Sequence, residues 1–93
     1  MKAIYKYPIN DMLPTNKIVA PIVRPLHVDY QDGITYLWAV VDNSIRNKSV
    51  IIARIGTGHP FDGAVIPLEN YMNTTVEQSA PYVWHWFYKI LEG

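Results

Sequence analysis

Apolar and polar side chains alternate with a period of two along most of this chain, and helical periodicity is hard to find. Alternation of this kind is typical of strands that bury one face. A short sixth stretch, Ala64–Pro67, fits the pattern more weakly, so we expect five or six strands. The five stronger predictions are Lys2–Ile9, Leu26–Gln31, Ile34–Asp42, Ser49–Thr57 and Tyr82–Leu91.

The segments between these runs carry residues that break or turn the chain. Prolines at positions 14, 21 and 25 predict an irregular crossing over Asn10–Pro25, because proline has no N–H to donate. Asp32-Gly33 between two β-rich runs predicts a tight hairpin. The polar run Asp42–Lys48 predicts a turn, and Glu69–Ser79, rich in Asn and Thr, fits either a loop or a single helical turn.

The predicted strands follow one another closely enough for an antiparallel meander. Leu37–Val41 and Val50–Ile55 are apolar on both faces, which is typical of central strands covered on both sides. A single sheet with two apolar faces must curl or find a partner. We therefore predict one mainly β domain over residues 1–93, either a half-barrel or a sheet packed in a dimer.

Composition excludes several classes of protein. The chain has 93 residues, 49% of them hydrophobic and 17% charged, with no cysteine and a net charge of zero. This balance excludes a disordered chain, a disulfide scaffold and a zinc-cysteine scaffold. Without net positive charge we expect no long nucleic acid as partner. Seven Tyr and three Trp in so small a domain favour a homo-oligomer.

The N-terminus holds no apolar run of the length of a secretion signal. The longest apolar run, Tyr36–Val41, is six residues and far shorter than a membrane span. We expect a cytoplasmic protein without a membrane partner.

The segment Gly56-Thr57-Gly58-His59-Pro60 is the most distinctive motif. Glycines allow backbone N–H groups to approach an anion, and Thr57 and His59 add hydrogen-bonding side chains. The plainer interpretation, which we favour from sequence, is a tight turn that leaves a strand. A P-loop is excluded because no Gly-Lys-Ser/Thr follows.

The last predicted strand places four large rings on one face, and such rings can stack on a flat ligand. The rival interpretation, favoured here, is that most of this stripe packs across a subunit interface or under a loop. Arginines, Arg54 among them, can contact a phosphate. The stripe consists of Tyr82, Trp84, Trp86 and Tyr88.

No pattern of catalytic or metal-binding residues is present in the sequence. His27, His59 and His85 lie on separate predicted elements and show no short ligand spacing, so we expect no metal site. There is no cysteine nucleophile, no Gly-x-Ser-x-Gly motif and no convincing carboxylate pair. We predict no catalytic residues and no cofactor.

Three strings of residues together resemble a family of short bacteriophage and prophage proteins. The resemblance runs from about residue 4 to residue 88, and the chain departs from the family pattern between Pro67 and Pro81, where it is longer. It implies a phage origin, the cytoplasm of an infected host, and no known activity. It also suggests that Trp38, the residues of the Gly56–His59 segment and His85 act together. The three strings are Tyr36-Leu37-Trp38-Ala39-Val40-Val41-Asp42, Ile55-Gly56-Thr57-Gly58-His59-Pro60 and Val83-Trp84-His85-Trp86-Phe87.

These observations lead to three hypotheses. The first is a non-enzymatic binding protein that antagonises host defence by sequestering a small anionic, nucleotide-like signal. The alternative is an inhibitor or adaptor that covers a host protein with its aromatic face. A third and weaker hypothesis is a small enzyme that uses His59 and His85 as acid and base. For the first hypothesis the candidate ligand-binding residues are Trp38, Arg54, Gly56, Thr57, Gly58, His59, Trp84, His85 and Trp86.

Overall fold

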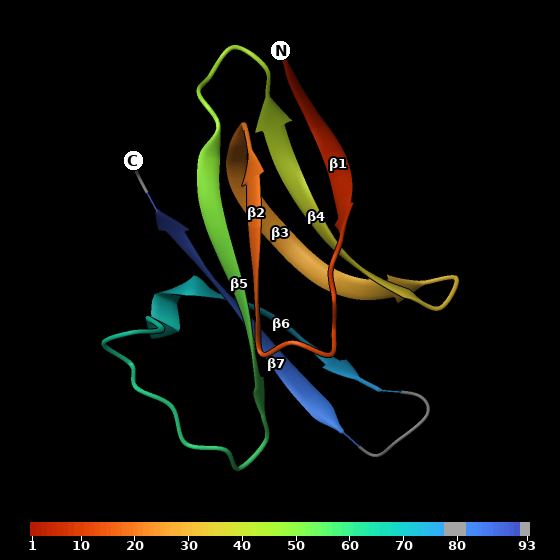
Figure 1. The fold of residues 1–93 in the computed structure, drawn as a ribbon, viewed down its shortest axis with the longest axis vertical. Helices are drawn as coiled ribbons and strands as arrows, with labels where there is room; N and C mark the ends of the chain where they lie inside the picture. The colour runs from red at the N-terminus through yellow and green to blue at the C-terminus, as the bar shows by residue number, and fades with distance from the viewer. Residues whose placement is uncertain (78–81, 92–93) are drawn as a thin grey trace.

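The structure, a computed structural model, describes residues 1–77 and 82–91 and forms two β-sheets (Figure 1). Within these residues the only helical element is a 3-10 turn at Leu68–Asn70. The strands are β1 (Lys2–Pro8), β2 (Thr15–Ala20), β3 (Ile22–Gln31), β4 (Ile34–Asp42), β5 (Lys48–Gly56), β6 (Tyr71–Val76) and β7 (Val83–Leu91).

The two sheets have the strand orders β1-β4-β3 and β2-β5-β7-β6, and every pairing is antiparallel. The mainly β class is confirmed, but the meander order is not. Only β3–β4 and β6–β7 pair with a neighbour in sequence. The chain changes sheet between β1 and β2, between β2 and β3, and between β4 and β5, so paired strands come from distant parts of the sequence.

The prediction of an irregular crossing over Asn10–Pro25 holds for residues 10–14 and is wrong for the rest, which forms β2 and the start of β3. Each of the three prolines lies at a position where the pairing of strands does not depend on a backbone N–H group. Pro14 precedes β2, Pro21 separates the two strands, and Pro25 lies at a register shift against β4. Prolines of this kind shape strand ends and bulges without preventing the strands from forming.

Two further segments differ from the sequence prediction. Ala64–Pro67 contains turns and bends and no strand. The polar segment after it begins with the 3-10 turn and continues as β6, so neither a loop nor a helical turn describes it fully; the predicted segment's residues 78 and 79 lie outside the described residues. The hydroxyl of Thr75 on β6 is buried and accepts a 2.8 Å hydrogen bond from Trp86 Nε1, which explains a polar residue at an inward position.

The main core lies between the two sheets of the one chain. Trp86, Ile22, Leu37 and Ile52 are its largest fully buried side chains. The two apolar faces therefore cover each other, where we had expected a curled single sheet or a second copy. The opposite face of β5 is also covered, because the segment after β5 folds back over it.

That outer cover explains why β5 is apolar on both faces. Ala53, Ile55 and Phe87 are buried on the outer face of the β5–β7 sheet. The ring of Phe61 packs on Phe87 with 5.6 Å between ring centroids. The prediction that this strand is covered on both sides is confirmed. On β4, for which the same prediction was made, the outer-face residues Tyr36, Trp38 and Val40 are only half-buried.

The turns on either side of β4 have clear local causes. Asp32 and Gly33 have φ values of 53° and 78°, as the predicted two-residue hairpin requires. Asp42, at the other end, accepts hydrogen bonds from the hydroxyl and the backbone N–H of Ser44. These two bonds, and after them the N-terminal ammonium group, lower the pKa of Asp42 to about 2.

On β1, burial and the neighbouring Tyr5 raise the pKa of Tyr7.

No helix among the described residues is long and apolar enough to cross a membrane.

Candidate functional site

The Gly56–Pro60 segment begins with a tight turn directly after β5. The N–H of His59 donates to the Gly56 carbonyl at 3.0 Å, and Gly58 has φ 84°, as the third residue of a type II turn requires. The N–H of Thr57 donates to the Val83 carbonyl at 3.3 Å. Two N–H groups of the loop are therefore used within the chain, which supports the turn interpretation over an open cradle for an anion.

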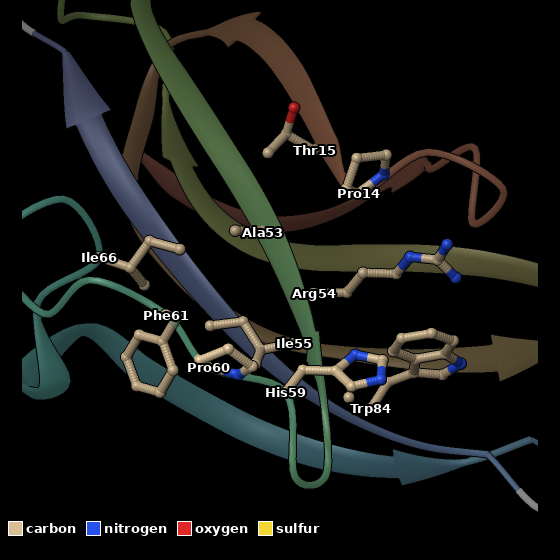
Figure 2. Close-up of a pocket in the computed structure, with 11 residues that line it drawn as sticks. Pro14, Thr15, Ala53, Arg54, Ile55, His59, Pro60, Phe61, Ile66 and Trp84 are labelled. Atoms are coloured by element: carbon tan, nitrogen blue, oxygen red, sulfur yellow. The ribbon is translucent and has the colours of Figure 1, made fainter.

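Gly56 is needed for its lack of a side chain rather than for an unusual φ. A Cβ atom at this position would lie 2.8 Å from His59 Nδ1 and 3.3 Å from Trp84 Cζ3. The imidazole and the indole therefore come close together over the glycine backbone. Figure 2 shows the His59 and Trp84 rings side by side at the end of β5.

Arg54, which lies on β5 two residues before Gly56, joins His59 and Trp84 in this group. Its guanidinium carbon lies 4.0 Å from the centroid of the Trp84 ring, within the range of a cation–π contact. Arg54 pairs with Trp86 in the ladder, and Trp84 lies two residues earlier on β7, on the same face. The stack thus follows from a diagonal cross-strand neighbour.

The guanidinium of Arg54 has little else to bind. It donates to the Met12 carbonyl at 3.5 Å, and within residues 1–77 and 82–91 it forms no ion pair. Most of its N–H donors are therefore available to a ligand. Guanidinium groups bind phosphate and carboxylate through two parallel hydrogen bonds.

These side chains line a hollow of about 400 Å³, which we call the Arg54 groove (Figure 2). The groove begins where the β2–β5 ladder ends, at the bond from Arg54 N–H to the Pro14 carbonyl (3.0 Å). Its walls are mainly apolar, with the guanidinium and the imidazole as the polar groups. The lining residues are Pro14, Thr15, Ala53, Arg54, Ile55, Gly56, His59, Pro60, Phe61, Ile66 and Trp84.

A second hollow of about 300 Å³, which we call the Glu77 hollow, shares Arg54 and Trp84 with the groove. It is more polar, because two carboxylates line it. Its residues are Asp11, Met12, Arg54, Glu77, Tyr82 and Trp84. The Arg54–Trp84 stack therefore stands between two adjoining hollows, and one small molecule can contact both.

His85 lies on the other face of β7 and anchors the loop. Its Nε2 is 2.8 Å from the hydroxyl oxygen of Thr57, and its Nδ1 is 2.9 Å from that of Thr74. Thr74 also bonds the hydroxyl of Tyr71. Both ring nitrogens thus have partners within the chain, so His85 and Thr57 hold the turn against β7.

Two predicted ligand-binding residues lie elsewhere. Trp86 is 1% exposed and belongs to the core between the sheets, so no ligand reaches it in this structure. Trp38 lies on β4, in the other sheet, where it stacks on His27 at 5.1 Å. Of the predicted ring stripe, Trp86 is buried in the core, Trp84 and Tyr88 are half-buried against it, and Tyr82, just before β7, is exposed.

The structure brings together Arg54, Gly56, His59 and Trp84, with Thr57 and Gly58 shaping the turn beside them. Sequence reasoning missed Asp11 and Glu77. Glu77 lies opposite Tyr82, whose carbonyl accepts its N–H at 2.9 Å. Assigning β6 as a strand would have placed this carboxylate near Trp84. No signal in the sequence indicated Asp11.

No group of three or more side chains suited to a metal ion occurs in the part of the chain that the structure describes.

Comparison with protein families gives a match over nearly the whole chain. The family model described as a domain of unknown function, DUF7352, matches residues 1–92. The chain belongs to the DUF7352 family. No curated protein and no solved structure matches it. The family match spans both sheets and both hollows, so the candidate site lies within the DUF7352 domain.

Proposed function

We propose that this protein is a non-enzymatic binding protein that sequesters a small anionic, nucleotide-like ligand, as a phage-type antagonist of a host defence signal. The observation that carries the proposal is the Arg54 guanidinium, which is stacked on Trp84 and free of a carboxylate partner in the described residues. A partly buried cation without a counter-ion stabilises an anion strongly.

The shape of the site supports a flat ligand. Trp84 and the guanidinium form a layered surface, and both aromatic rings and guanidinium planes stack on nucleobases. His59 adds a hydrogen-bonding side chain at the wall of the groove. A phosphate on Arg54 and a base against the stack would use both properties of the site at once.

The arrangement of the hydroxyl groups supports binding without chemical conversion. The closest approach to a nucleophile and base is Thr57 with His85, and the third member of that chain is Thr74. A threonine hydroxyl does not stabilise a charged imidazole as a carboxylate does. We therefore expect the bound ligand to be recovered unchanged.

Native mass spectrometry of the purified protein tests the proposal directly. It gives the number of subunits and the mass of any small molecule that co-purifies. Heating should then release that molecule with its mass unchanged. A released product that differs from the molecule supplied would contradict the binding function and indicate an enzyme.

Replacing Arg54→Gln gives the matching prediction at the level of one residue. Titration calorimetry with nucleoside monophosphates should show binding weakened roughly ten- to hundredfold, the usual loss for charge-assisted hydrogen bonds. Arg46→Gln is the control, because Arg46 is an exposed arginine in the turn before β5. Equal affinities of the two variants would show that Arg54 does not hold the ligand.

A further inference from the structure

The Glu77 hollow holds opposite charges that do not pair with each other. Arg54, Asp11 and Glu77 all line it, yet neither carboxylate lies within ion-pair distance (4.0 Å) of the guanidinium. Charges that share a hollow without contact leave room for a ligand between them. Such a ligand must offer an acceptor or negative charge to Arg54 and N–H donors to the carboxylates.

Each carboxylate is already held by a donor of the protein. Trp84 Nε1 donates to Glu77 Oε2 at 3.3 Å, and the hydroxyl of Thr35 donates to Asp11 Oδ2 at 2.8 Å. In both cases the second oxygen has no protein hydrogen bond in the described residues. The acidic groups are therefore oriented and still able to accept from a ligand.

Glu77 is the better placed of the two to read a stacked base. It is bonded to the edge of the Trp84 indole, and the same indole carries the Arg54 stack. A base in contact with that stack turns its edge toward the rim where Glu77 lies. The ladder end at Val76 and Val83, followed by the bond from Glu77 N–H to the Tyr82 carbonyl, fixes the backbone of this residue.

We infer that Glu77 makes the site selective for guanine nucleotides. This inference rests on the proposed function, because it assumes that a nucleotide occupies the site. Guanine is the one common base with two adjacent donors on its pairing edge, N1–H and the 2-amino group, and a carboxylate accepts both. Adenine and cytosine set a ring-nitrogen acceptor beside their amino group, and uracil flanks its N–H with two carbonyls. Those acceptors repel Glu77 and Asp11.

Titration calorimetry with GMP, IMP, AMP, CMP and UMP tests the inference. IMP is the most informative comparison with GMP, because it keeps N1–H and lacks the 2-amino group. We expect GMP to bind about tenfold or more tightly than AMP, in keeping with a bidentate contact between a side chain and a base, with IMP between them.

The variant Glu77→Gln provides the second part of the test. Glutamine keeps an oxygen for Trp84 Nε1 and presents an amide in place of the free carboxylate oxygen, so the fold should be retained and the preference for GMP lost. Glu69→Gln, at an exposed acidic residue of the 3-10 turn, should keep the preference.

The outcomes separate the two proposals. Equal binding of all five nucleotides, weakened by Arg54→Gln, would overturn guanine selectivity and leave the binding function standing. A GMP preference that survives Glu77→Gln would also overturn the role of Glu77. Binding of none of the five would overturn both proposals.

Discussion

At the scale of single residues, the candidate site depends on Gly56 having no side chain. Gly56 has ordinary backbone angles for a strand end, but the His59 ring occupies the space where its Cβ would be. Gly58 differs, since its positive φ is required by the turn itself. The motif thus uses two glycines for two reasons, close approach and backbone angle.

Replacing Gly56→Ala should displace His59 without unfolding the protein, because the tip of a side chain can move more easily than the backbone. GMP affinity, measured by titration calorimetry, should fall between about twofold and tenfold, the loss of one neutral hydrogen bond. Gly63→Ala is the matched control in the same loop, because a Cβ there would meet nothing within 4 Å. A similar fall in both variants would argue against His59 as part of the site.

At the scale of elements, a side-chain amide on β6 bridges the two sheets. Asn73 on β6 accepts a 2.8 Å hydrogen bond from Val28 N–H on β3 and donates a 2.7 Å bond to the Val28 carbonyl. The side chain replaces the neighbouring strand that the β3 edge lacks at this point. Asn73 lies next to the register shift that separates its pairing with Trp86 from that of Tyr71 with Phe87.

Removing this amide by Asn73→Ala should leave both backbone groups of Val28 without a partner. We expect the free energy of unfolding to fall by about 1–3 kcal/mol, the cost of unsatisfied, partly buried polar groups. Urea denaturation followed by tryptophan fluorescence measures it. Asn47→Ala, at an exposed position before β5, should change stability little; a loss as large as that of Asn73→Ala would contradict this role.

At the scale of the whole molecule, β5, which was predicted to be apolar on both faces, needs two separate covers. The inner face of β5 packs on the other sheet, and its outer face is covered by the loop that also forms the Arg54 groove. The loop therefore contributes to stability and to the site together. Of the seven Tyr and three Trp residues that suggested a partner on composition alone, only Trp86 is buried within the chain, and Tyr5, Tyr71 and Tyr82 are exposed.

The core between the sheets should dominate the stability of the fold. Leu37→Ala, at a side chain with no exposure on β4, should lower the free energy of unfolding by about 2–5 kcal/mol. Ile34→Ala on the same strand, at a side chain 46% exposed, should change it by no more than about 0.5 kcal/mol. Comparable losses in the two variants would show that the sheets do not pack as described.

The sequence by itself determined what depends on near neighbours. Alternation located β4, β5 and β7, Asp32-Gly33 located the hairpin, and two glycines located the turn before Pro60. Local patterns can reveal these features because the backbone angles of a strand or a turn depend mostly on residues a few positions apart.

Tertiary structure alone decided the rest. It turned Trp86 inward, moved Trp38 to the other sheet, made β2 and β6 strands through pairing, and brought Glu77 and Asp11 to the Arg54–Trp84 stack. Pairing between distant strands carries no local signal, because the partner of each strand is selected by the burial of both sheets at once. A site assembled from the loop before β2, the end of β5, the residue after β6 and the start of β7 follows only from that selection.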